Sequence, residues 1–300
     1  MTIRDALIES TLRLEEAHVP NARLTAEHLL ASHLAVDRAY LFAHDDRILT
    51  SQVVLTFRYT VELRAGGVPT QYIVGRQEFF GRNFAVDSAV LIPRPETELL
   101  VECALRRIPR GDFPSIVDVG TGSGAIAVTV ALERPEARVI ATDISFEAID
   151  VARRNASSLG ATVSFVQSDL IEALAPGFDF VLSNPPYIDP ADAPTLDREV
   201  RDHEPAIALF APEAGLGTIR RLIPAAAGAL KPGGYLIFEI GMGMESRVLP
   251  LFGADWLPPS FEADLQGIPR TVIARGGSTN VSWLDRSCPP GMQTHTQTRR

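Results

Sequence analysis

The spacing of hydrophobic positions changes along the chain and divides it into parts of different structure. In residues 1–70, apolar side chains recur every three or four positions, which is typical of amphipathic helices. We expect one helix to begin after Thr2, a second after Asn21 and a third at Ser51, because these residue types favour helix N-termini. This part is therefore predicted to be a small helical domain.

Residues 71–92 show another pattern. Residues 71–80 and 84–87 are rich in aromatic and branched side chains, and a Gly-Arg-Asn turn separates them. Such a sequence predicts a β-hairpin, which would connect two domains. Directly after it, Pro95 occupies the position that proline favours at the start of a helix, and we expect that helix to run to about Arg107.

From residue 93 to residue 275, short apolar runs alternate with amphipathic segments. The apolar runs predict strands at 115–119, 138–142, 162–166, 178–183, 234–240 and 269–274. The amphipathic segments predict helices at 124–133, 146–158, 215–230 and 244–252. This alternation predicts a doubly wound α/β domain with a mostly parallel sheet. Residues 276–300 are polar and have no period, so we expect a disordered tail.

The amino-acid composition indicates the cellular compartment and the class of binding partner. With 46% hydrophobic residues the chain can bury a large core, and its net charge of −9 disfavours direct binding to nucleic acid. Cys103 and Cys288 have neither disulfide-framework nor metal-ligand spacing, which indicates a reducing compartment and no metal. No apolar run is long enough to span a membrane, and the N-terminus does not resemble a signal peptide. We expect a cytoplasmic protein.

A glycine-rich loop, Asp118-Val-Gly-Thr-Gly-Ser-Gly124, follows the first strand of the α/β domain and opens a helix. Glycines let the backbone approach a ligand closely, and the free N–H groups at the helix start can bind it. The loop also satisfies the dinucleotide fingerprint, with Asp143 near the expected ribose-binding position. A nicotinamide cofactor and S-adenosylmethionine therefore both remain open on this loop. The candidate cofactor-binding residues here are Gly120, Thr121, Gly122, Ser123 and Gly124.

A third landmark, Asp169-Leu170, follows the third predicted strand. Together, the loop, Asp143 and this pair resemble class I S-adenosylmethionine-dependent methyltransferases, which have a Rossmann-like fold. The resemblance implies that Asp143 binds the ribose hydroxyls and that Asp169 and Leu170 flank the adenine. It favours S-adenosyl-L-methionine as the cofactor.

An Asn-Pro-Pro-Tyr motif follows the fourth predicted strand. The side-chain oxygen of Asn184 and the carbonyl oxygen of Pro185 can accept both N–H bonds of a planar NH2 group, since a residue before proline is held extended. The ring of Tyr187 can lie against the face of that group. Asn184, Pro185 and Tyr187 are the candidate catalytic residues, and Asn184 would also border the cofactor. The candidate substrate-binding residues are Asn184, Pro185, Pro186 and Tyr187.

Further motifs make the chain resemble the HemK/PrmC family. The most discriminating is Pro-Arg-Pro-Glu-Thr-Glu at 93–98, which joins Gly-Arg-Gln-Glu-Phe-Phe-Gly at 75–81, Glu-Pro at 204–205 and Glu-Ile-Gly at 239–241. Family members often have an aromatic residue at the position of Leu170 and a glutamine at that of Met244.

The resemblance implies a specific reaction. HemK/PrmC enzymes methylate the side-chain amide nitrogen, N5, of the glutamine in the Gly-Gly-Gln motif of peptide chain release factors, which modulates translation termination. The family resemblance also implies that residues 1–70 dock the protein substrate beside the methyltransferase domain at 93–275. The alternatives are a methyltransferase for a ribosomal-protein glutamine or for an exocyclic amine of a nucleic-acid base, and a catalytically idle docking protein.

Overall fold

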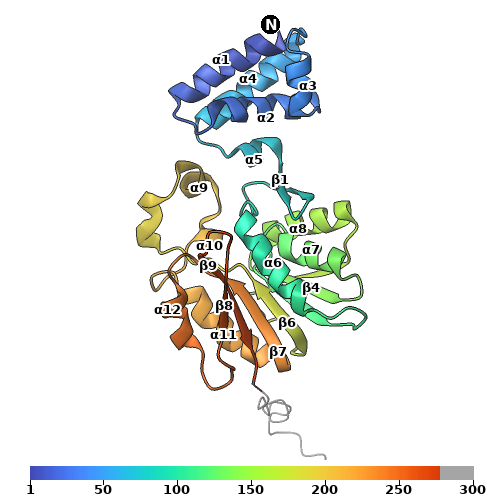
Figure 1. The fold of residues 1–300 in the computed structure, drawn as a ribbon, viewed down its shortest axis with the longest axis vertical. Coiled ribbons are helices and arrows are strands. Elements are labelled where there is room, and N and C mark those ends of the chain that lie inside the picture. The colour runs from blue at the N-terminus through green and yellow to red at the C-terminus, as the bar shows by residue number, and fades with distance from the viewer. Residues whose placement is uncertain (278–300) are drawn as a thin grey trace, which may run out of the picture.

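A computed structural model describes residues 1–277, in which a helical domain is linked through a β-hairpin to an α/β domain (Figure 1). The Thr2 hydroxyl accepts from the backbone N–H of Asp5, and the Asp5 carboxylate accepts from that of Thr2, so a capping box begins the first helix. Asn21 precedes the second helix, but its side chain makes no capping hydrogen bond. The helices are α1 (Ile3–Glu16), α2 (Ala22–Leu34), α3 (Arg38–Ala43), which was not predicted, and α4 (Ser51–Ala65).

The connector differs in part from the prediction. The expected strand at 71–80 is wrong over its first half, where α5 (Thr70–Val74) forms a short helix that ends at Gly75, with φ +77°. Strands β1 (Arg76–Phe79) and β2 (Arg82–Ala85) then pair antiparallel, as predicted for the hairpin. Pro69 at the start and a glycine at the end confine the segment to one helical turn, which alternation alone does not reveal.

Seven strands form the sheet of the α/β domain, in the order β5-β4-β3-β6-β7-β9-β8. All pairs among the first five strands are parallel, and β9 and β8 pair antiparallel at one edge. The edge strand β8 was not predicted, because it is short and only half-buried. The strands are β3 (Ser115–Val119), β4 (Arg138–Asp143), β5 (Val163–Gln167), β6 (Phe178–Ser183), β7 (Leu230–Glu239), β8 (Ser260–Ala263) and β9 (Pro269–Arg275).

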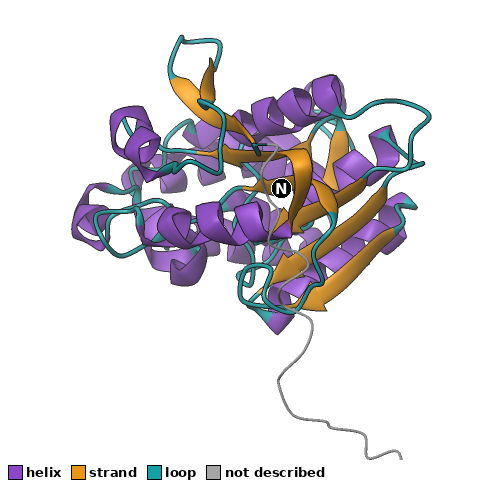
Figure 2. Ribbon diagram, turned by 90° about the horizontal axis from the view of Figure 1, so that it is seen from below, coloured by secondary structure: helices purple, strands orange, loops and turns teal. Residues whose placement is uncertain are grey.

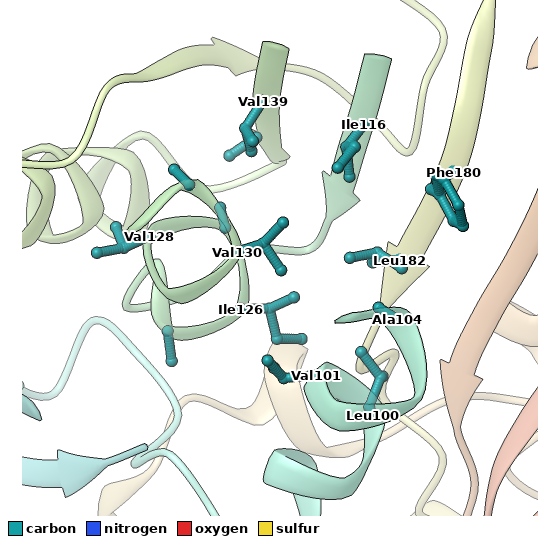
Figure 3. Close-up of a cluster of buried hydrophobic side chains, with 14 of the residues drawn as sticks. Leu100, Val101, Ala104, Ile116, Ile126, Val128, Val130, Val139, Phe180 and Leu182 are labelled. Carbon is teal, nitrogen blue, oxygen red and sulfur yellow. The ribbon is translucent and has the colours of Figure 1, made fainter. Parts of the chain in front are cut away.

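Helices cover both faces of this sheet, which confirms the doubly wound α/β prediction (Figures 1 and 2). Successive residues of β3 point to opposite faces, so that Ile116 packs beneath α6 and α7 while Val117 packs beneath α11. Figure 3 shows the first of these two cores. The helices are α6 (Pro95–Arg107), α7 (Ala125–Glu133), α8 (Phe146–Leu159), α9 (Arg198–His203), α10 (Ala206–Leu209), α11 (Gly217–Ala229) and α12 (Glu245–Val248).

Near the end of the described chain, two predictions need correction. The helix expected at 244–252 is only α12 followed by the 3-10 turn η2 (Leu249–Leu251), because Pro250 lacks the N–H that would extend it. Gly276, placed in the disordered tail, instead pairs with Trp256 in a β-bridge. The rest of the predicted tail, residues 278–300, lies outside the described residues.

The sheet order determines where a ligand can bind. From β3 the chain moves outward through β4 and β5, and then returns to the other side of β3 with β6 and β7. At such a reversal the connections leave β3 and β6 in opposite directions and a crevice opens at the carboxyl ends of the strands. The glycine-rich loop follows β3 and the Asn-Pro-Pro-Tyr motif follows β6, so both motifs meet at this crevice.

The helical and α/β domains also touch through α9. The buried guanidinium of Arg64, on α4, forms an ion pair with Glu199 of α9. At Gly67 an added Cβ would lie 3.3 Å from Nε of Arg198 and 3.4 Å from Nε2 of His203, so a glycine permits this close approach. The loop that carries α9 therefore connects the helical domain to the α/β domain.

Asn155 of α8 ties the hairpin to the glycine-rich loop, and replacing it by alanine tests this tie. Its buried side chain accepts from the N–H of Ala85 and donates to the carbonyl oxygens of Ala85 and Ser123. Asn155→Ala leaves these groups unpaired, and we expect it to lower the free energy of unfolding by about 3 kcal/mol in urea titrations. The control is Ser157→Ala at an exposed site on the same helix, which should change it by less than about 0.5 kcal/mol.

Candidate active site

A cavity of about 320 Å³ opens at the carboxyl ends of the parallel strands. Its wall contains the loop after β3, the ends of β4 and β5, the Asn-Pro-Pro-Tyr motif after β6, and segment 89–94 from the connector. This volume lies within the range of small-molecule sites, and most of the wall is apolar with a few polar groups. Of the predicted site residues, those that line it are Gly120, Thr121, Gly122, Ser123, Asp143, Asp169, Leu170, Asn184, Pro185 and Pro186.

The three glycines of the loop have different physical roles. Gly120 and Gly122 line the cavity with φ of +71° and +53°, and a Cβ on either would meet no protein atom within 4 Å. Gly124 does not line the cavity. A Cβ there would lie 3.1 Å from Cβ of Ala152, so this glycine permits close packing of α7 on α8. Its predicted contact with the cofactor stays a prediction.

Asp118, which precedes these glycines, is completely buried at the end of β3. One carboxylate oxygen accepts from the Thr121 hydroxyl at 2.6 Å and from the N–H of Ala127 at 3.2 Å, while Oδ1 has no hydrogen-bond partner among the described residues. Burial raises the pKa of Asp118 to about 7, against the effect of these two donors. The carboxylate thus holds the loop and the start of α7 together.

Asp143 ends β4 beside the loop. Its Oδ2 accepts from the N–H of Gly122 and its Oδ1 from that of Ser145, each at 2.9 Å. Burial raises its pKa from the ordinary value. Each carboxylate oxygen can accept more than one hydrogen bond, so both retain capacity toward the cavity. This arrangement suits a partner that offers two adjacent hydroxyl groups.

Asp169 and Leu170 follow β5 on the same wall. The carboxylate of Asp169 forms an ion pair with Arg221 of α11 at 2.7 Å, and Arg221 lines the cavity as well. Leu170 has a positive φ of +49°, which is uncommon outside glycine. Together with Ile144 it gives this end of the cavity an apolar wall. The sequence did not indicate Arg221 or Ile144.

The Asn-Pro-Pro-Tyr motif is fastened at both ends. Nδ2 of Asn184 donates to Oγ1 of Thr97 at 3.0 Å, and the Tyr187 hydroxyl donates to Oε1 of Glu239 at 3.0 Å. Asn184 Oδ1 and the Pro185 carbonyl accept no hydrogen bond from any described residue. Tyr187 is not among the lining residues, so its stacking on a substrate stays a prediction.

Segment 89–94 is held against the cavity by two side chains that the sequence did not single out as site residues. The carboxylate of Glu204, which is buried, accepts from the N–H of Ile92 and from the guanidinium of Arg94. The Tyr72 hydroxyl donates to the carbonyl oxygen of Val90 at 2.6 Å. Since the segment has no strand or helix of its own, these bonds determine its course beside the cavity.

Known proteins resemble this chain in sequence and in fold. Residues 5–75 match the family described as "PrmC N-terminal domain", and residues 95–198 match "Methyltransferase small domain". A release factor glutamine methyltransferase of Koribacter versatilis is 45% identical over 92% of this chain and 99% of the relative. One of Geobacter sulfurreducens is 42% identical over 92% and 97%. A solved methyltransferase from Pyrococcus furiosus shares the fold, with a TM-score of 0.50, 18% identity, and coverage of 76% of this chain and 100% of that one.

The chain belongs to the release factor glutamine methyltransferase family. This confirms the family resemblance and the predicted methyltransferase fold with a small N-terminal helical region. Membership of a methyltransferase family argues against the nicotinamide enzyme that the glycine-rich loop had left open. The protein is a methyltransferase rather than an idle docking protein.

Two findings apply only to the described part of the chain. Within residues 1–277, no group of three or more His, Cys, Asp or Glu side chains is arranged to hold a metal ion. No helix in this range is long and apolar enough to cross a membrane.

Sequence reasoning missed the residues that support the motif. Thr97 lies inside the Pro-Arg-Pro-Glu-Thr-Glu string, which the sequence indicated only through its family resemblance. Glu98 of the same string has a structural contact, because its carboxylate accepts from the backbone N–H of Phe80 at 2.7 Å. The signal for Thr97 and Glu239 was present, because each stands in a string that carried the family resemblance, but neither has a recognisable catalytic spacing.

The buried carboxyl of Asp118 predicts a pH dependence of stability. Its pKa is raised in the folded state, so between about pH 4 and pH 7 the folded chain keeps a proton that the unfolded chain has lost. Stability from this group is therefore present at low pH and lost as pH rises to about 7. Relative to Asp118→Asn, wild-type stability should fall across this window by up to about 4 kcal/mol.

Urea unfolding of both proteins without cofactor, at half-unit steps from pH 4.5 to 8, measures the difference. Other buried carboxyls are present in both proteins, so their contributions cancel apart from that of Asp143, which interacts electrostatically with Asp118. Parallel curves would show that Asp118 is ionised throughout.

Proposed function

We propose that this protein transfers a methyl group from S-adenosyl-L-methionine to the side-chain amide nitrogen of the glutamine in the Gly-Gly-Gln motif of peptide chain release factors. The observation that carries the proposal is the hydrogen bonding of the Asn184 side chain. Its NH2 group donates to Thr97, while its carbonyl oxygen and that of Pro185 lie beside the cavity and accept no hydrogen bond within residues 1–277. Two adjacent acceptors without donors suit a planar NH2 group.

The residues of the cavity fit S-adenosylmethionine. Gly120 and Gly122 leave backbone open to a ligand, and the two oxygens of Asp143 retain acceptor capacity for a ribose. Ile144 and Leu170 supply an apolar wall for an adenine, with Asp169 at its edge. When bound, the cofactor supplies an activated methyl group on a sulfonium.

The amide of a glutamine is a weak nucleophile because its lone pair is delocalised into the carbonyl group. Asn184 Oδ1 and the Pro185 carbonyl would accept both N–H bonds and hold the nitrogen in one orientation. As the N–CH3 bond forms and the S–CH3 bond breaks, positive charge develops on the nitrogen and both hydrogen bonds strengthen, so this contribution is larger in the transition state than in the ground state. The nitrogen then loses one of its two protons, which leaves the methylated amide neutral. Orientation and charge stabilisation are therefore the chemistry that we assign to this chain.

Several observations favour a protein amide over a nucleic-acid base, which the same motif could also hold. The chain has a net charge of −9, whereas binding a phosphate backbone favours basic surfaces. The relatives that cover nearly the whole chain are named for release factors and not for nucleic acid. A cytoplasmic location accords with such a substrate, since translation termination takes place there.

We also propose that residues 1–70 dock the release factor. The helical domain stands apart from the α/β domain in Figure 1, and α9 bridges the two beside Glu204, which holds segment 89–94. A protruding loop of a folded partner could then enter the cavity while another part of the partner contacts the helices.

Replacing Asn184 tests the proposed chemistry. Asn184→Ala removes one of the two acceptors, and we expect kcat to fall at least about 100-fold. The dissociation constant for S-adenosylmethionine, measured by calorimetry, should stay within about threefold. Asp192→Ala, at an exposed position in the turn that follows, should keep wild-type kcat.

Substrate identity is tested with labelled S-adenosylmethionine, purified release factor, ribosomal proteins and nucleic acid in separate reactions. Mass mapping should place the methyl group on the glutamine of the Gly-Gly-Gln motif. Label confined to a ribosomal protein or to a nucleic acid would contradict the proposal.

If residues 1–70 dock the release factor, their removal should weaken activity on the intact release factor more than activity on a short peptide. The KM for intact release factor should rise at least about tenfold, whereas kcat/KM for a short free Gly-Gly-Gln peptide should stay within about threefold. Thermal unfolding and cofactor binding of the truncated protein serve as controls for its folding. Equal losses on both substrates would argue against docking by this domain.

A further inference from the structure

A buried carboxylate lies behind the Asn-Pro-Pro-Tyr motif. Glu239 ends β7 and is 1% exposed, yet it forms no ion pair with any described residue. Its two oxygens accept from two hydroxyls of distant parts of the chain: Oε2 from Thr97 at 2.6 Å and Oε1 from Tyr187 at 3.0 Å. A buried carboxylate is costly unless it is well bonded, so these two donors are essential to its presence there.

The bonds around Glu239 have a fixed direction. The ionised carboxylate of Glu239 can only accept, so in that state the single hydroxyl proton of Thr97 is committed to Glu239. The oxygen of Thr97 can then act only as an acceptor toward Asn184. Of the two ends of the Asn184 amide, only the NH2 end can donate to it, and the two are 3.0 Å apart. The amide is therefore turned with its carbonyl oxygen away from Thr97.

The opposite orientation would disable the site. With the amide turned over, the NH2 group of Asn184 would face the NH2 group of the substrate, and neither can accept from the other. An asparagine side chain has no steric preference between its two ends, so only its hydrogen-bond partner selects one.

Glu239 also fixes Tyr187, at the other end of the motif. Its hydroxyl meets the second oxygen of Glu239, and its ring packs on Gly241, where an added Cβ would lie 3.1 Å from Cδ2 of the ring. One carboxylate thus holds the residues on both sides of Pro185 and Pro186.

We propose that Thr97 and Glu239 are positioning residues that act through Asn184, by turning its carbonyl oxygen toward the substrate amide. This inference rests on the proposed function and adds to it the group that makes Asn184 an acceptor. Thr97 lies on α6 and Glu239 on β7, so the orientation of the motif depends on how these two elements pack.

The direct test replaces the Thr97 hydroxyl by a methyl group of similar size. Thr97→Val should lower kcat on release factor about 10- to 50-fold, because the productive orientation of Asn184 then leaves its NH2 group without an acceptor. The KM for release factor and the affinity for S-adenosylmethionine should stay within about twofold. Thr97→Ser retains the hydroxyl and should recover kcat to within about threefold of wild type. Thr129→Val is the matched control. Thr129 is also buried, but its hydroxyl has no hydrogen-bond partner in the described part of the chain, and kcat should not change.

A double-mutant cycle shows whether Thr97 acts through Asn184. In single-turnover reactions, Thr97→Val should cause no further loss in the Asn184→Ala background. Glu239→Gln removes the charge at constant volume and lets the side chain donate to Thr97. Because Glu239 also holds Tyr187, this variant should lower kcat at least as much as Thr97→Val does. Adding Thr97→Val to Glu239→Gln should cause no further loss.

The outcomes separate the two proposals. The positioning role would be overturned if Thr97→Val lowered kcat by the same factor in the wild-type and Asn184→Ala proteins. It would also be overturned if Thr97→Ser were as slow as Thr97→Val. Either result would leave the proposed function standing. Failure of the wild-type protein to methylate release factor, or full activity of Asn184→Ala, would instead overturn the proposed function itself.

Discussion

The hydrogen bonds to the buried carboxylate of Glu239 are the constraint on which the active site depends. This group lies at the end of a central strand, where the protein interior makes an unpaired charge very unfavourable, and burial raises its pKa above the ordinary value. Hydroxyls from α6 and from the loop after β6 satisfy its two oxygens. Because both must be in place at once, the carboxylate joins helix, strand and loop into one arrangement, and the free acceptors of the site follow from it.

The remainder of the cavity is built by the same principle, in which a carboxylate holds a segment that has no regular structure. Asp118 and Asp143 fasten the glycine-rich loop, and Glu204 fastens segment 89–94. Loops at the ends of parallel strands carry unpaired backbone N–H groups, and acidic side chains are the strongest acceptors available for them. The acidic residues of this chain therefore contribute to the shape of the site as well as to its charge.

Much of the α/β domain was predictable, because buried parallel strands appear as apolar runs and their helices as amphipathic segments. The strands at 115–119 and 178–183 match the structure at both ends. Short elements were missed: α3 and β8 have few buried residues, and α5 sits in a segment whose alternation also fits a strand. Gly124 and Tyr187 belong to the expected motifs but are not among the residues that line the cavity. Their local contacts, with Ala152 and with Glu239, could not be read from the motifs, because the partners come from other elements.

The sequence by itself determined the class of the protein and the local chemistry of each motif, because those depend on residue types and spacings within a few positions. It identified the glycine-rich loop, Asp143 and the Asn-Pro-Pro-Tyr motif, and through family resemblance a methyl transfer to a glutamine. Only the tertiary structure decided how the motifs are held, since Thr97 and Glu239 are 142 residues apart and share a hydrogen bond. No local pattern can encode such a contact, because it arises when α6 packs against the end of β7.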